Sequence, residues 1–567
     1  MRLKTIICLL VAICSSIPVF GQDSIYRFYG TSYQGFLREV AAGGNLDDDG
    51  IPDFILSEVF ATVFGTQNTG RISAYSGRTG TLLYFLSGVP GQNHKFGHEL
   101  DFIGDINGDG RTDFIASDPF ASFNGIESGR VTVHSGVDGA VLFTYDGNPD
   151  LDFDGSGDFL GFAISGAGDA NNDGTPDFMY GRPGNYIAGG ACSAANDSGE
   201  VVVRSGVDGT VIFNITGQPF CRTLGFSLDG VGDVNGDGYD DIVVGHDNAG
   251  LGQVIVAGGS PPAIIHVIDG LPRSFLGHRV FGAGDVNGDG TADFAAFSFV
   301  FDASFNPLPG ELTIFSGVDA SAIHHLTGQS NHDRFGAGFE PVEDLDGDGK
   351  DEFLIGAWGA DPNGGSSGIL ELFNGADASS LFSWNGSAAG NGVGDHGTFA
   401  PLGDVNFDGK LDVVATRTIM PIYQGQADVF TVRDLPLEVL PHTTSISYGS
   451  YVHFALNAPA TESGNTYYLL GSVSGFTPGI ELGGGLNLPL NPDIFLQFTL
   501  DFDNSPIFGG VGFIDNFGSG SASWSIGAGT IPANLAGVST YWAYLTYDPG
   551  AAAYSFASNH AIHTLIP

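Results

Sequence analysis

Short apolar runs recur along the chain, each directly after a turn rich in Asp, Asn and Gly. Examples are FIAS after Asp113 and IVVG after Asp241. Apolar runs of four to eight residues that are bounded by such turns are typical of buried β-strands. The pattern therefore predicts an all-β chain of many short strands.

The polar turn occurs seven times. Measured from the second residue of each copy, successive spacings are 60, 64, 64, 52, 59 and 60 residues. A period near 60 that never drops out indicates a repeat architecture. The copies are GNLDDDGIPDF (44–54), GDINGDGRTDF (104–114), GDANNDGTPDF (168–178), GDVNGDGYDDI (232–242), GDVNGDGTADF (284–294), EDLDGDGKDEF (343–353) and GDVNFDGKLDV (403–413).

Each repeat contains four strand-like runs. In the second unit an apolar run entered through Gly precedes the turn (96–105) and another follows it. A third run ends in a tight turn (129–139), and a fourth follows at 140–147. Four strands are the content of a propeller blade, so the sequence predicts a seven-bladed β-propeller. The run SIYRFYG (24–30) matches the fourth-strand pattern, and we expect residues 25–29 to complete the seventh blade; the alternative is a frayed terminus.

The composition changes after Arg433. Residues 434–567 contain no Lys or Arg and alternate apolar with polar positions, as in SYVHFAL and IFLQFTLDF. This pattern predicts a small C-terminal all-β, sandwich-like domain over 435–567, after a propeller over 22–434.

Charge narrows the choice of partners. The chain carries 64 acidic and 19 basic residues, a formal net charge of −45. Nucleic acid and anionic membrane surfaces are poor partners, because both require clustered Lys and Arg. A hydrophobic content of 42% indicates a folded core rather than an acidic disordered chain.

The first 21 residues read as a secretory signal. Arg2 and Lys4 precede an apolar run, and Val19 and Gly21 suit cleavage before Gln22. No later run is long enough to span a bilayer, so we expect no membrane insertion and a secreted or cell-surface location. Cys192 and Cys221 remain in the mature chain, and export favours a disulfide between them; two free thiols are the alternative.

The repeated turn has the chemistry of a calcium loop. Counted from the second residue of each copy, oxygen-bearing side chains fall at positions 1, 3, 5 and 9, and position 6 is Gly. Of these 28 side chains, 22 are carboxylates and six are Asn. The predicted Ca²⁺ ligands, up to seven ions with one per blade, are Asn45, Asp47, Asp49, Asp53, Asp105, Asn107, Asp109, Asp113, Asp169, Asn171, Asp173, Asp177, Asp233, Asn235, Asp237, Asp241, Asp285, Asn287, Asp289, Asp293, Asp344, Asp346, Asp348, Glu352, Asp404, Asn406, Asp408 and Asp412.

Two other interpretations fit the loops less well. An EF-hand needs Glu at position 12 and flanking helices, but position 12 is Leu56, Ala116, Tyr180, Val244, Ala296, Ile355 or Ala415. Metal-free Asx turns would leave three or four carboxylates repelling one another in every copy. Mg²⁺ is disfavoured because it requires stricter octahedral geometry.

The Phe-Gly motif, the acidic nine-residue loop and the 60-residue unit resemble FG-GAP repeats, which build the seven-bladed head of integrin α subunits and propellers of secreted bacterial proteins. The resemblance covers about residues 22–434. It implies that the loops lie on one face and that partners dock on the other. It also implies that Cys192 and Cys221 lie on that second face.

The expected ligand face carries aromatic residues on its long, variable segments. They are Phe120, Phe123, Tyr186, Phe301, Trp358 and Tyr423. Aromatic side chains on loops suggest contact with an extracellular protein or a glycan, and packing within the loops is the alternative. No nucleophile–base pattern appears, so we expect binding or adhesion rather than catalysis. The alternatives are a polysaccharide lyase or hydrolase on this scaffold and a structural surface-layer component.

Overall fold

The computed structural model describes residues 24–432 except for 31–36, 64–67, 90–94, 149–156, 184–198, 218–223, 247–250, 303–305, 408–409 and 420–423. From residue 437 on, it describes the backbone of strands only. The chain divides into two compact units, Met1–Val432 and Arg433–Pro567. In the described residues, no helix has the length and apolar character needed to cross a membrane.

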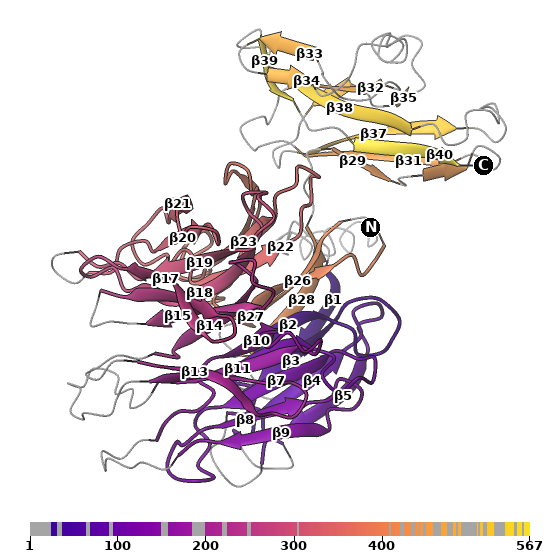
Figure 1. Ribbon diagram of the computed structural model, residues 1–567. Helices are drawn as coiled ribbons and strands as arrows, with labels where there is room; N and C mark the ends of the chain where they lie inside the picture. Colours follow the sequence, from indigo (N-terminus) through magenta and orange to yellow (C-terminus); the bar gives the residue numbers. More distant parts are fainter. Residues whose placement is uncertain are drawn as a thin grey trace, which may run out of the picture. The chain divides into compact units, whose positions relative to one another are not determined.

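The first unit is a seven-bladed β-propeller. Its described residues form seven antiparallel sheets of four strands, and six of these contain four strands that are consecutive in sequence (Figure 1). The predicted blade count and strand content are therefore confirmed.

The strands occupy equivalent places in every blade. The first strands, which surround the axis, are β2 (Leu37–Gly44), β6 (Leu100–Gly104), β10 (Ile164–Gly168), β14 (Ser227–Gly232), β18 (Leu276–Gly284), β22 (Gly338–Val342) and β26 (Phe399–Gly403). The second strands are β3 (Asp53–Glu58), β7 (Asp113–Asp118), β11 (Asp177–Arg182), β15 (Asp241–His246), β19 (Asp293–Ser298), β23 (Glu352–Ala357) and β27 (Asp412–Ile419). The third strands are β4 (Arg71–Tyr75), β8 (Arg130–His134), β12 (Glu200–Arg204), β16 (Gln253–Gly258), β20 (Glu311–Phe315), β24 (Ile369–Phe373) and β28 (Gln424–Thr431). The fourth strands are β5 (Leu82–Ser87), β9 (Val141–Asp146), β13 (Val211–Thr216), β17 (Ala263–Asp269), β21 (Ala322–Thr327), β25 (Ser380–Asn385) and β1 (Ser24–Tyr29).

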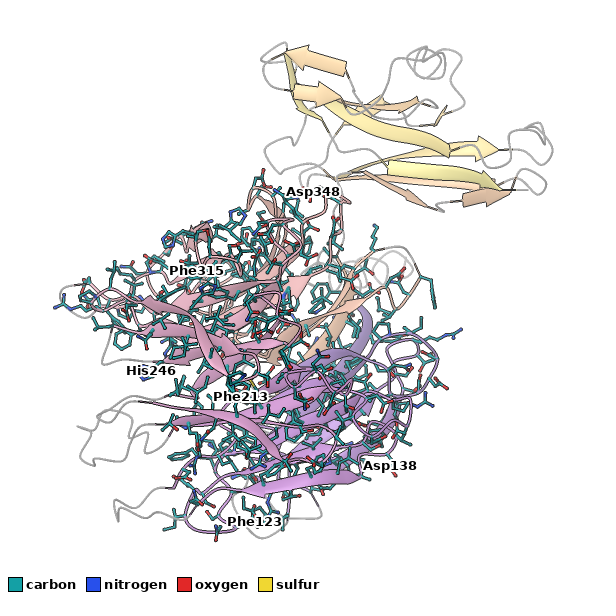
Figure 2. The ribbon with its side chains drawn as sticks, in the orientation of Figure 1. Phe123, Asp138, Phe213, His246, Phe315 and Asp348 are labelled. Carbon is teal, nitrogen blue, oxygen red and sulfur yellow. The ribbon has the colours of Figure 1, made fainter. Side chains whose placement is uncertain are left out.

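The hydrophobic core lies between neighbouring blades. The second strands are buried on both faces, which explains their uninterrupted apolar runs. Each pair of adjacent sheets encloses its own apolar cluster; Phe213 lies between the third and fourth blades and Phe315 between the fourth and fifth (Figure 2). Stability of the ring therefore depends on every blade having two neighbours.

The Phe-Gly motif links one blade to the next. Phe96 bridges Gly70, at the start of the preceding blade's third strand, and Leu160 bridges Gly129 in the same way. The glycine of the motif is needed because Gly97 has φ of 83° and a Cβ there would lie 2.9 Å from Cβ of Ser57. The motif is thus a contact between blades, repeated around the ring.

The N-terminal strand closes the ring. β1 pairs antiparallel with β28, so that Tyr29 lies opposite Gln426, and Figure 1 shows the two strands side by side. Arg27 Nε lies 2.5 Å from Oδ1 of the buried Asp428. The expectation that residues 25–29 complete the seventh blade is confirmed.

The second unit contains twelve described strands. They are β29 (Leu437–Leu440), β30 (Thr443–Ser445), β31 (Ser450–Asn457), β32 (Thr466–Ser472), β33 (Ile480–Gly483), β34 (Leu486–Leu488), β35 (Ile507–Phe508), β36 (Val511–Phe513), β37 (Ser519–Ile526), β38 (Ser539–Asp548), β39 (Ala553–Ala557) and β40 (Ala561–Ile566). They pair as β29-β31-β37-β35, as β30-β40-β38-β32-β36 with β39 on β38, and as β33-β34. The sandwich-like packing expected for this segment stays a prediction.

Removing the closing strand tests its role in stability. We expect a chain that begins at Thr31 to melt at least about 5 °C below one that begins at Gln22, because β28 becomes an exposed edge and a cooperative ring loses one strand. Differential scanning calorimetry measures both melts, and a synthetic peptide of residues 22–30 should restore the lost stability. Equal melting temperatures for the two chains would show that β1 contributes nothing to closure.

Candidate metal-binding loops and the opposite face

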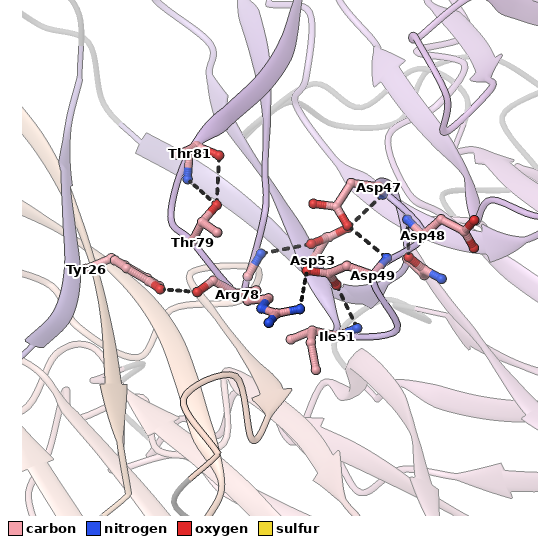
Figure 3. Close-up of polar contacts among 11 residues, drawn as sticks. Tyr26, Asp47, Asp48, Asp49, Ile51, Asp53, Arg78, Thr79 and Thr81 are labelled. Carbon is pink, nitrogen blue, oxygen red and sulfur yellow. Dashed lines mark hydrogen bonds and ion pairs between the residues drawn. The ribbon is translucent and has the colours of Figure 1, made fainter.

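The seven acidic loops lie at one face of the propeller, where each joins the first strand of its blade to the second. In the second blade, β6 ends at Gly104 and β7 begins at Asp113, so positions 1 to 8 form the loop and position 9 starts the strand. Figure 3 shows the first loop, with Asp47, Asp49 and Asp53 converging beside Arg78 of the neighbouring turn.

The carboxylate at position 1 organises the loop backbone. Asp105 Oδ1 accepts hydrogen bonds from the amides of Gly108 (2.8 Å) and Asp109 (3.1 Å), and its Oδ2 accepts one from Gly110 (2.8 Å). Equivalent bonds to the position-6 amide are made by Asp169, Asp233, Asp285 and Asp344. The same side chain that is a predicted ligand therefore also fixes the turn.

Two positions of the loop have left-handed backbone. Gly110, at position 6, has φ of 85°, as expected for the sharp turn. Position 4 is also left-handed, with φ of 74° at Gly108, 56° at Asn172 and 62° at Phe407. Sequence reasoning missed this second requirement, although Gly, Asn or Asp fills position 4 in every copy except the seventh.

The carboxylate at position 9 has a role that the sequence did not reveal. All seven, Asp53, Asp113, Asp177, Asp241, Asp293, Glu352 and Asp412, are fully buried. Asp113 Oδ2 accepts from the amides of Ile106 (3.0 Å) and Asn107 (3.3 Å), and its Oδ1 accepts from that of Gly136 (2.9 Å). Gly136 belongs to the turn between the third and fourth strands, so one carboxylate joins the loop to that turn.

Burial also changes the acidity of these groups. It raises the pKa of Asp113 to about 6 and that of Asp177 to about 7, while the amides that bond to each carboxylate oppose the rise. A cation close to these carboxylates would favour their ionised form. A cation in the loop would therefore lower the raised pKa of the buried acid at position 9.

The loops fit a calcium ion by their donor set, and in the sixth loop the spacing of the side-chain oxygens fits as well. In the sixth loop, oxygen atoms of Asp344, Asp346 and Asp348 all lie within 4.8 Å of one another. Two oxygens bound to one Ca²⁺ at about 2.4 Å lie at most about 4.8 Å apart. The other predicted ligands occupy the same positions in their loops, except that Asp408 lies outside the described residues.

Neighbouring loops are bonded to one another. The amide of Asp169, at position 1 of the third loop, donates to Oδ2 of Asp240 in the fourth loop (2.7 Å), and Asp285 and Asp351 are joined in the same way (2.8 Å). Loops one and two are joined through Asn45 and Thr112 (3.0 Å). The first six loops are therefore joined in three pairs on this face.

The opposite face is built from the connections between second and third strands and between blades. Among the predicted ligand residues there, Phe120, Phe123, Phe301 and Trp358 are half-buried. Lys95 Nζ lies 3.9 Å from the ring centre of Phe120, and Arg130 Cζ lies 3.3 Å from that of Phe123. Trp358 packs on Arg334, and Phe301 on Phe275 and Phe299. These four side chains thus pack mainly against residues of neighbouring segments.

Other predicted residues of that face lie outside the described part of the chain. They are Tyr186, Tyr423, Cys192 and Cys221. The structure instead exposes apolar side chains that sequence reasoning did not single out. Ile126, between β7 and β8, is 63% exposed, and Leu271, between β17 and β18, is 75% exposed.

Comparison with known proteins gives one consistent family of relatives. No protein-family profile matches the chain. It is similar to integrin alpha-5 of Xenopus laevis, 27% identical over 228 residues (36% of this chain and 20% of that protein), and to integrin alpha-V of Gallus gallus, 27% identical over 231 residues (36% and 20%). Integrin alpha pat-2 of Caenorhabditis briggsae is 30% identical over 240 residues (38% and 18%).

The chain therefore spans about a fifth of the length of the curated relatives it matches. Among solved structures, the Dos1 propeller aligns with 73% of this chain and 95% of its own at 9% identity, with a TM-score of 0.41. The seven blades, the repeated loop and the similarity to integrin α chains lead to one conclusion. This chain carries an FG-GAP-like propeller that is similar to the propeller of integrin α chains.

Proposed function

We propose that the protein is a calcium-stabilised propeller that binds an extracellular partner, a protein or a glycan, through the face opposite its acidic loops. The observation that supports this most strongly is the separation of the two faces. The repeated loops all occur where first strands end, and the connections that differ between blades all occur where second strands end. A surface that repeats suits a structural role, and a surface that varies suits recognition.

Calcium is the ion that the loops suit best. Asp344, Asp346 and Asp348 offer hard oxygen donors at a spacing that one Ca²⁺ can bridge. The bound ion would offset the repulsion among these carboxylates and with the buried acid at position 9. Its binding energy would then add to the stability of the blade.

An extracellular setting supports this assignment. The integrin α relatives share this kind of propeller, and the first 21 residues have the pattern of a cleaved signal. Within the same proposal, Cys192 and Cys221 form a disulfide on the recognition face, and residues 435–567 form an appended β-sandwich-like domain.

Removal of calcium tests the structural part of the proposal. We expect a chelator to lower the melting temperature by about 10 °C or more, because up to seven ions stabilise the folded state only, and added Ca²⁺ should restore it better than Mg²⁺. Asp348→Asn should reduce the bound calcium by one ion per chain, measured by calorimetric titration. Asp138→Asn is the matched control, since it removes the same charge from an exposed turn of the same face and should leave the stoichiometry unchanged (Figure 2). A melt that a chelator does not alter would refute the calcium assignment.

The recognition face is tested by apolar-to-charged substitutions. We expect Ile126→Asp and Leu271→Asp each to weaken binding of a ligand at least about tenfold, because exposed apolar side chains are typical contact points. The ligands are those found by the array screen described below. Val137→Asp and Val318→Asp change residues on the loop face that are also more than half exposed, and they should leave binding intact.

Glycan and extracellular-protein arrays supply the ligands for this test. Binding without chemical change supports recognition, whereas new reducing or unsaturated sugar ends would favour the lyase or hydrolase alternative. If substitutions on the two faces reduced ligand affinity equally, the assignment of the recognition face would be wrong.

A further inference from the structure

A polar cavity of about 220 Å³ lies on the axis of the propeller and is lined by first-strand residues of all seven blades. Five of its lining side chains are carboxyls, and one Arg is the opposing charge. The carboxyls, the Arg and one His are Glu39, Glu99, Asp101, Asp229, Glu340, Arg279 and His396. None of them belongs to an acidic loop, so the calcium assignment does not account for them.

The lining residues form two levels that follow from strand periodicity. Glu39, Glu99 and Arg279 each lie six residues before position 1 of their loop, and Asp101, Asp229 and Glu340 lie four residues before it. Residues two apart on a strand point to the same side, so both levels face the axis. The level with Glu39 and Glu99 is nearer the recognition face, because first strands run from that face toward the loops.

The side chains of the upper level converge. Carboxylate oxygens of Glu39 and Glu99 and a ring nitrogen of His396 all lie within 4.8 Å of one another. His396 Nε2 lies 3.5 Å from Glu99 Oε2. Two ligands bound tetrahedrally to one Zn²⁺ at about 2.1 Å are about 3.4 Å apart, so this separation suits a shared ion.

The carboxylates of this level are buried and incompletely bonded. Glu39 is 3% exposed and Glu99 is 5% exposed. Glu39 Oε2 and Glu99 Oε1 are buried without a hydrogen-bond partner. Arg279 Nη1 lies 3.8 Å from Glu99 Oε1, beyond hydrogen-bond distance. Buried carboxylate oxygens without donors are costly, and a cation is the partner that would satisfy both.

The backbone holds Glu39 in this position. Gly397 follows His396 directly, and a Cβ at Gly397 would lie only 1.5 Å from Glu39 Oε1. The amide of Val40 also donates to the carbonyl of Gly397 (2.7 Å). Glycine at 397 therefore allows Glu39 to reach His396 across the contact between the first and seventh blades.

From these observations we propose a single divalent metal site on the propeller axis, with Glu39, Glu99 and His396 as ligands and Zn²⁺ as the preferred ion. One imidazole and two carboxylates form a donor set of the type used by zinc, whereas calcium sites use oxygen alone. Three protein ligands leave at least one coordination position for water or for a group of a bound partner. The site is distinct from the calcium loops in its residues, its face and its ion.

Calorimetric titration of Zn²⁺ in the presence of excess Ca²⁺ tests the site. The chain used carries Cys192→Ser and Cys221→Ser, so that thiols do not compete for zinc. We expect one zinc per chain, and Glu39→Gln, Glu99→Gln and His396→Gln should each weaken binding at least about tenfold. His325→Gln is the matched control, because His325 forms a surface pair with Glu311 (3.9 Å) and its loss should change the affinity less than twofold. Absence of zinc binding, or binding that the three substitutions leave intact, would overturn the proposal.

A second measurement does not depend on the folding of the variants. Mn²⁺ bound to the chain with excess Ca²⁺ should show coupling to one imidazole nitrogen in pulsed electron paramagnetic resonance. The oxygen-only loops cannot produce this coupling, so its absence would also overturn the proposal. Retention of the calcium-dependent melt identifies the substituted chains that are still folded.

Discussion

A buried carboxylate at the start of each second strand is the interaction on which the blades depend. In the second blade Asp113 binds the amides of Ile106 and Asn107 on one side and that of Gly136 on the other. It thereby joins the loop after the first strand to the turn after the third. Burying a carboxylate is unfavourable unless its oxygens are satisfied, and these three amides meet part of that need. The loop supplies one further donor, because Nδ2 of Asn107 donates to Oδ1 of Asp113 (3.2 Å).

The two faces of the propeller therefore differ in how strongly their residues are constrained. Bonds between neighbouring loops, such as that from Asp169 to Asp240, join the first six loops of the loop face in pairs. Its side chains are occupied with the backbone of their own turns and with the next blade. On the opposite face the Phe-Gly motif also joins successive blades, but the connections around it differ in length and composition. Variation is therefore permitted on the side where contact with a partner is proposed.

The sequence predicts the repeated strands and loops of this molecule and misses the contacts that join them. The period near 60 residues, the four apolar runs per unit and the match of SIYRFYG to a fourth strand were enough to predict seven blades and the closing strand. The bond from Asp113 to Gly136 joins positions 23 residues apart, and no periodicity marks such a pair. The packing of Phe120 under Lys95 is likewise decided by tertiary contacts that a single sequence does not display. The spacing of residues within one loop predicts its chemistry, whereas it does not predict which residues of different strands contact one another.

The axis of the propeller shows how a ring of repeats can create an asymmetric site. In four blades, a small residue lies six residues before position 1 of the loop, where the first strands converge on the axis. These residues are Ala163, Ser227, Gly338 and Thr398. The equivalent positions of the first and second blades are Glu39 and Glu99, and His396 comes from the seventh. These three blades are consecutive only because β1 completes the seventh sheet and the ring closes. Closure thus brings residues from opposite ends of the propeller sequence together, and departure from the repeat concentrates metal-ligating groups on one side of the axis.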